Sequence, residues 1–95
     1  MTAIDDCLGD LIQTLDHEGL SDDTILVYTS DHGSMLGSHG IHHKQVPRDE
    51  SILVPFLLHY PGVFGNEARE VEIPFNVTDI MPTILGLCNV DIPAS

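Results

Sequence analysis

Positively charged residues are scarce in this sequence. It contains three lysines and arginines together against fifteen aspartates and glutamates, which gives a formal net charge of −12. Binding to nucleic-acid phosphates depends on clustered cations, so this class of partner is excluded. Tryptophan is missing, and no stretch approaches the roughly 20 consecutive apolar residues that a membrane-spanning helix needs.

Cysteine is equally scarce. The two cysteines, Cys7 and Cys88, lie near opposite ends of the chain in segments with helical periodicity. We therefore expect two free, buried thiols and no disulfide scaffold. The residues after Met1 show neither the basic region nor the apolar region of a secretory signal, and the sequence assigns no compartment.

Apolar residues are plentiful, at 42% of the chain, which is more than a disordered acidic segment carries. Apolar positions recur at three- and four-residue intervals from Thr2 to about Glu18 and predict an amphipathic helix. Thr2 is the expected N-cap, and Gly19 is placed to end the helix in the left-handed conformation. Residues 24–29 are β-branched and almost continuously apolar, which is typical of a strand covered on both faces in a parallel sheet.

The second half of the chain is more irregular. Residues 30–50 hold several glycine and proline breakers and no sustained periodicity, so we expect a long loop, and loops of that length are usually functional. A second strand is predicted over residues 52–60, ended by Pro61-Gly62, and a short third strand over residues 71–73.

A last helix is predicted from about Asp79 to Leu87, with Thr78 or Asp79 as its cap. The order helix, strand, long loop, strand, helix indicates an α/β fold. Two strands cannot cover both faces of a strand as apolar as residues 24–29, so we expect residues 1–95 to form a single partial domain that needs the remainder of a larger sheet.

The most informative local feature is Ser30-Asp31-His32-Gly33, directly after the first strand. Ligands of α/β proteins gather at the carboxyl ends of strands. The Asp31 carboxylate and the His32 imidazole can face one cation, and two such ligands still fall short of the number that Ca²⁺ or catalytic Zn²⁺ requires. The alternative is that Asp31 caps the turn and His32 is an ordinary surface residue.

Lys44, the only lysine, follows a cluster of histidines in this acidic chain. It is a candidate for holding an anion beside the metal, and the alternative is a solvated lysine paired with Asp49 or Glu50. His43 is a candidate proton donor to a leaving group. A zinc site built from the clustered histidines matches no established ligand spacing.

The run from Thr24 to Gly62 carries SDHG, MLG, HG, Lys44, ES, VP and YPG in that order, and VTDIMPTIL follows at residues 77–85. This pattern resembles the C-terminal part of the catalytic domain of the type I, formylglycine-dependent sulfatases of the alkaline-phosphatase superfamily. The resemblance covers nearly the whole chain and implies a three-layer α/β/α sandwich.

The resemblance also implies site roles. Asp31 and His32 would bind a divalent cation, usually Ca²⁺, Lys44 would contact the sulfate group, and His43 is a further catalytic candidate. The implied substrate is a sulfate-ester small molecule or a sulfated glycan, and the implied partner is the remainder of the sulfatase chain. If the whole protein follows the family, the resemblance implies a periplasmic, secreted or lysosomal location.

Two family features are missing. No Cys/Ser-x-Pro-x-Arg motif, the source of the formylglycine nucleophile, occurs in these residues, and Asp5-Asp6 lies in the first helix and does not follow a strand. We therefore expect a sulfatase segment that is inactive alone. The alternatives are a phosphonate or phosphate ester hydrolase of the same superfamily and a non-catalytic acidic metal-binding or interaction module.

Overall fold

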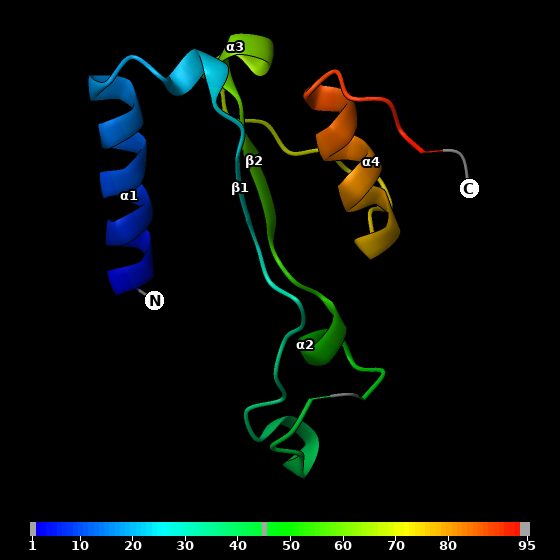
Figure 1. The fold of residues 1–95 in the computed structure, drawn as a ribbon. Helices are drawn as coiled ribbons and strands as arrows, with labels where there is room; N and C mark the ends of the chain where they lie inside the picture. Colours follow the sequence, from blue (N-terminus) through cyan, green and yellow to red (C-terminus); the bar gives the residue numbers. More distant parts are fainter. Residues whose placement is uncertain (1, 45, 94–95) are drawn as a thin grey trace.

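The computed structural model describes residues 2–44 and 46–93, which form helices on both sides of a two-stranded sheet (Figure 1). The helices are α1 (Thr2–His17), α2 (Asp49–Ile52), α3 (Pro61–Phe64) and α4 (Val77–Leu87), the strands are β1 (Leu26–Thr29) and β2 (Phe56–His59), and two 3₁₀ turns are η1 (Ser21–Asp23) and η2 (Ser38–Gly40). In Figure 1, α1 and α4 flank the strand pair, and the long segment between the strands extends beyond one end of it.

Helix α1 confirms the first predicted helix. It ends at His17, and Gly19 follows with φ +67°, while the amide of Leu20 donates to the carbonyl of Leu15 and that of Gly19 to Asp16. These two bonds form a Schellman motif, which satisfies carbonyls that the last turn would leave unpaired. Thr2 lies inside α1, so its prediction as the N-cap is wrong.

The sheet differs from the expected parallel arrangement. Strands β1 and β2 pair antiparallel, with Leu26 opposite His59 and Thr29 opposite Phe56. Parallel neighbours need a crossover connection, usually a full helix, whereas the chain between these strands turns back through the single helical turn α2. Strand β1 also starts two residues later than predicted, at Leu26, although the backbone of Thr24 after η1 is already extended.

The loop predicted over residues 30–50 contains η2 and the start of α2, and the second strand is correspondingly shorter than predicted. Helix α2 begins after Arg48, whose carbonyl accepts from the amides of Ser51 and Ile52. The acidic Asp49 and Glu50 in its first turn favour the positive end of a helix. Pro55 disfavours helical backbone at the preceding residue, so the chain becomes extended again before β2.

Helix α4 begins two residues before the predicted start. Asn76 is its N-cap: the Asn76 side chain accepts from the amide of Thr78, and the Asp79 carboxylate accepts from the amide of Asn76 in a capping box. The prediction of Thr78 or Asp79 as the cap is therefore wrong. The predicted strand at residues 71–73 is also wrong, because Val71 and Ile73 lie in irregular backbone and are exposed.

Little of the chain is buried. Among the described residues, Met35 at 2% exposure and Ser51 at 3% are the only fully buried side chains, and Cys7 and Cys88 are free but exposed, so the prediction of buried thiols is wrong. The chain exposes 7816 Å², whereas a compact protein of this length exposes about 5,400 Å². The excess exposed surface is comparable in area to a large obligate protein–protein interface. No described helix is long and apolar enough to cross a membrane.

Candidate metal and anion site

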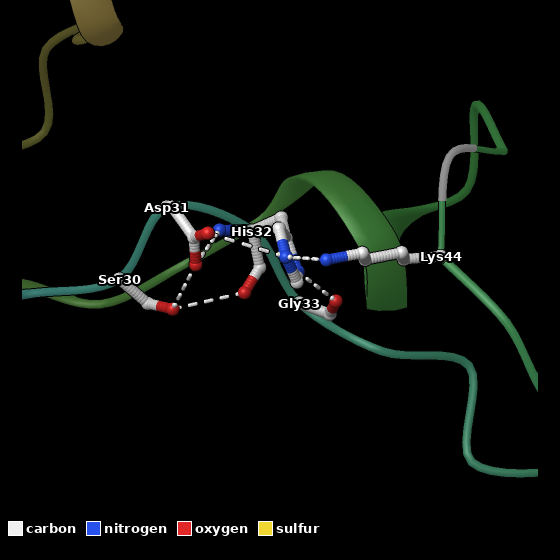
Figure 2. Close-up of polar contacts among 5 residues, drawn as sticks. All are labelled: Ser30, Asp31, His32, Gly33 and Lys44. Atoms are coloured by element: carbon white, nitrogen blue, oxygen red, sulfur yellow. Dashed lines mark hydrogen bonds and ion pairs between the residues drawn. The ribbon is translucent and has the colours of Figure 1, made fainter.

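The turn after β1 is held by short-range hydrogen bonds (Figure 2). The hydroxyl of Ser30 donates to the carbonyl of His32 at 2.9 Å, and the amide of His32 donates to Oδ1 of Asp31 at 3.0 Å. The Asp31 side chain thus caps the turn, as the alternative interpretation expected. The cap occupies Oδ1, and Oδ2 faces the His32 ring.

The hydrogen-bond pattern assigns the tautomer of His32. Its Nδ1 lies 2.8 Å from the carbonyl oxygen of Gly33, which can only accept, so Nδ1 carries the proton in the neutral ring. Nε2 then presents a lone pair. It lies 3.2 Å from Oδ2 of Asp31, so two Lewis-basic atoms from adjacent residues converge on one point.

Lys44 completes this cluster. Its Nζ lies 2.6 Å from Nε2 of His32, and the ammonium donates to the imidazole lone pair (Figure 2). The alternative ion pair of Lys44 with Asp49 or Glu50 does not form among the described residues. The structure thus brings together three of the four residues that the sequence selected, namely a carboxylate, an imidazole and an ammonium group, but not His43.

Electrostatics favour the charged form of Asp31. Desolvation, the largest single effect, raises the pKa of the carboxyl group. The electrostatic interaction with His32 and the hydrogen bonds from the His32 amide, the Asp31 amide and the Ser30 hydroxyl act in the opposite direction and outweigh it, so the net pKa lies below the ordinary value of 3.8. A carboxylate that stays ionised is an effective cation ligand.

Helix α2 holds the turn from behind. The amide of Gly33 donates to the carbonyl of Ser51 at 2.8 Å, and Ser51 is one of the two fully buried residues. A Cβ on Gly33 would lie only 2.0 Å from the carbonyl oxygen of Glu50, so only glycine permits this approach. Glu50 and Ser51 were not predicted to support the site, and the ES motif within the quoted pattern was the available signal.

The cluster lies at the edge of a cavity of 910 Å³ between the end of β1, α2 and α4. Asp31, His32 and Lys44 line its polar part, and Phe56, Phe75 and the start of α4 line its apolar part. The arrangement therefore offers cationic and metal-ligating groups beside an apolar wall.

The donor set suits a divalent cation in part. Cis ligands at metal–ligand distances of about 2.1–2.4 Å lie about 3.0–3.4 Å apart, which agrees with the separation of Asp31 Oδ2 from His32 Nε2. Within residues 2–44 and 46–93, no third histidine, cysteine, aspartate or glutamate joins these two in a metal-ligand group. The remaining ligands of a divalent ion would have to come from outside the described chain.

His43 is exposed, and no hydrogen bond or ion pair among the described residues joins it to Asp31, His32 or Lys44. Its predicted role in protonating a leaving group therefore stays a prediction. His39 instead faces Glu50, with Nε2 3.8 Å from Oε1, and the ring of His42 lies against Gly37.

The sequence model of the Sulfatase family matches residues 1–90. The ulvan-active sulfatase of Formosa agariphila is 46% identical over 94 residues, which cover 97% of this chain and 18% of that protein. A solved structure from work on glycosaminoglycan metabolism by Bacteroides thetaiotaomicron matches with a TM-score of 0.83 and 34% identity, over 94% of this chain and 18% of that one. Another, in complex with its substrate D-glucosamine-2-N,6-O-disulfate, matches with a TM-score of 0.77 and 32% identity, over 99% of this chain and 19% of the other.

The chain thus spans less than one fifth of the length of these relatives. The agreement with solved sulfatase structures assigns the alkaline-phosphatase-like α/β fold class that the sequence indicated. With a family model that covers residues 1–90 and a relative at 46% identity, this chain belongs to the sulfatase family.

Proposed function

We propose that residues 1–95 are the C-terminal part of the catalytic domain of a sulfuric ester hydrolase. In this proposal Asp31 and His32 are ligands of a divalent metal, and Lys44 binds the sulfate group. The observation that carries the proposal is the contact of Lys44 Nζ with His32 Nε2 at 2.6 Å, because it brings an ammonium group and the metal-ligand pair to one point. Hydrolysis of a sulfate ester needs positive charge around the non-bridging oxygens.

The expected cation is Ca²⁺ or another divalent ion, and when bound it would supply Lewis-acid polarisation of a sulfate oxygen. Asp31 contributes a carboxylate oxygen with a lowered pKa, and His32 contributes Nε2 in the tautomer set by Gly33. Ca²⁺ takes about 6–8 oxygen-type ligands, so most of its ligands would come from the remainder of the sulfatase chain.

Lys44 would bind the anion through its free N–H donors. An ammonium group has three donors, and among the contacts that the structure describes one of them engages Nε2 of His32. A metal ion bound at Nε2 would take the same lone pair, so metal binding would release this donor to the anion. We expect the nucleophile, a formylglycine made from a Cys/Ser-x-Pro-x-Arg motif, in a part of the protein outside these 95 residues. His43 is our candidate to protonate the leaving alcohol, and the isolated segment is expected to be inactive.

The similarity to sulfatases named for ulvan and solved with a sulfated glucosamine favours a sulfated glycan as the substrate class. The apolar wall of the cavity beside the cluster leaves a sulfate-ester small molecule as the second possibility. A phosphonate or phosphate ester hydrolase and a non-catalytic metal-binding module are the alternatives that the experiment separates.

The test uses the full-length protein and measures release of inorganic sulfate from an aryl sulfate and from a sulfated glucosamine. Lys44→Ala is expected to lower kcat/KM about 10²- to 10³-fold, as removal of a preorganised charge-stabilising donor does. The matched control is Arg69→Ala, because Arg69 stacks over the Phe64 ring 5.0 Å away in a segment that does not line the site cavity. Equal kcat/KM in both variants would remove Lys44 from the site.

The metal assignment has its own measurement. Asp31→Asn should lower the amount of bound calcium as well as the turnover rate. Asp23 lies in η1, before β1, and Asp23→Asn should change neither quantity. Faster turnover of a phosphate or phosphonate ester than of every sulfate ester would favour the alternative hydrolase. Stable monomeric folding of the 95-residue chain with calcium binding would favour the non-catalytic module.

A further inference from the structure

Helix α2 contacts both segments that carry the site. Through Ser51 it accepts the amide of Gly33, which fixes the turn with Asp31 and His32. Through the neighbouring residue, Glu50, it accepts the hydroxyl of Ser38 at 2.5 Å. Two consecutive residues of one helical turn therefore hold both the turn with Asp31 and His32 and the segment with Ser38.

The segment held by Glu50 has an unusual backbone. Leu36 has φ +47°, Gly37 +94°, His39 +53° and Gly40 +72°, and two of these four residues are not glycines. Left-handed conformations at residues other than glycine cost energy and persist only where neighbouring contacts impose them. The exposure of Leu36, at 86%, leaves its side chain little packing to impose this backbone.

The contacts available to hold this turn are few. Met35, fully buried, anchors its start, and the amides of Gly40 and Ile41 donate to carbonyls within the turn itself. The side chains that tie the turn to another element are those of Ser38 and His39, and both meet the Glu50 carboxylate. Lys44 follows this turn by a few residues, so its reach toward His32 depends on where the turn lies.

We propose that Glu50 is a positioning residue that fixes the turn at residues 36–40 on α2 and thereby places Lys44 against His32. Its Oε1 is the common partner of the Ser38 hydroxyl and the His39 ring. The Ser38 hydrogen bond is the leading cause that lowers the pKa of Glu50, and the charges of His39 and Arg48 lower it further, so the carboxylate is ionised at neutral pH. The link from Glu50 to turnover rests on the proposed function, whereas the link from Glu50 to the turn does not.

The test compares Glu50→Ala, Glu50→Gln and Asp49→Ala in the full-length protein. Asp49 is the matched control, because it is the adjacent exposed carboxylate on the same helical turn. Glu50→Ala is expected to lower kcat/KM about 10- to 100-fold, since displacement of a binding group by about 1 Å has effects of this size. Glu50→Gln should restore most of the loss, because its amide oxygen still accepts from Ser38.

A double variant separates positioning from general support of the fold. If Glu50 acts through Lys44, then adding Glu50→Ala to Lys44→Ala should change kcat/KM by less than about threefold, because the group that Glu50 places is already gone. Losses that multiply in the double variant would overturn the proposal. Equal kcat/KM in the Glu50→Ala and Asp49→Ala variants would overturn it as well.

Amide hydrogen exchange provides a readout that is independent of the reaction. Exchange at Gly40 and Ile41 should be faster in Glu50→Ala than in Asp49→Ala, even if the parent protein releases no sulfate from any ester. Unchanged exchange would overturn the proposal that Glu50 fixes the turn at residues 36–40. Failure of the parent to hydrolyse sulfate esters, with faster exchange in Glu50→Ala, would refute the proposed function and still support the role of Glu50 in fixing the turn.

Discussion

Gly33 offers the sharpest test of how α2 supports the site. A Cβ built on Gly33 would lie 2.0 Å from the carbonyl oxygen of Glu50 and 2.9 Å from its carbonyl carbon. Both obstructing atoms belong to backbone, so a rotamer change cannot relieve the clash. Gly33→Ala would force the two backbones apart by roughly 1.4 Å to reach an ordinary contact.

This displacement has two costs. Overpacking of this kind typically destabilises by about 1–3 kcal/mol, and loss of the bond from the Gly33 amide to Ser51 adds about 0.5–1.5 kcal/mol. The displaced turn carries Asp31 and His32, so kcat/KM for a sulfate ester should fall about 100-fold and bound calcium should decrease. Urea unfolding, initial rates of sulfate release and metal content measure these effects in the full-length protein.

Gly62→Ala is the matched control. A Cβ on Gly62 would lie 2.1 Å from the carbonyl oxygen of Asp22, which is the same kind of clash between α3 and η1 at the opposite end of the strand pair (Figure 1). Gly62→Ala should lower the free energy of unfolding by a comparable amount and leave kcat/KM near the parental value. The same loss of kcat/KM in both variants would refute the reasoning, and so would a Gly33→Ala protein with parental activity and metal content.

Three further predictions concern stability. Asn76→Ala removes the N-cap of α4 and should lower the free energy of unfolding by about 1 kcal/mol, measured by urea unfolding. The Ser38 hydroxyl, foremost, lowers the pKa of Glu50 in the folded state, so the stabilisation by this carboxylate is fully present above its ordinary pKa of 4.5 and is lost as the pH falls through the lower folded value. The difference in unfolding free energy between the parent and Glu50→Gln should accordingly be constant near neutral pH and shrink below 4.5, and a difference that grows on acidification would contradict this sign. The 95-residue chain alone, with its excess exposed surface, should self-associate in sedimentation experiments, and a stable monomer would contradict that expectation.

Local sequence rules predicted the features that depend on local physics. The apolar periodicity of α1 and the glycine after it depend on helix geometry within a few residues, and the prediction agreed with the structure nearly to the residue. The turn with Asp31 and His32 was found because polar residues follow an apolar strand. Lys44 was selected by its chemistry as the only lysine, and the structure brings its ammonium group to His32, although its role as an anion ligand stays a prediction.

Features that depend on contacts between distant segments were predicted poorly. The apolar character of β1 favoured a parallel sheet, because burial on both faces looks the same in a sequence whichever way the neighbouring strand runs. Helix α2 was missed because a single turn has too few residues to show periodicity. Asn76 was missed as the cap because Asn76, Thr78 and Asp79 are all of residue types favoured at the N-cap, so the sequence does not choose among them. The capping box that fixes the start depends on side-chain geometry.

The arrangement of charges explains how Lys44 is available for the proposed anion site in a chain with a net charge of −12. A lysine paired with a carboxylate would have to break that ion pair before it bound sulfate. Glu50, a carboxylate on the helix behind the site, instead meets Ser38 and His39, while Lys44 donates to the lone pair of His32 Nε2. The hydrogen bond that fixes the turn thus also keeps this carboxylate engaged away from the ammonium group. The same contact therefore accounts for both the position of Lys44 and its availability for an anion.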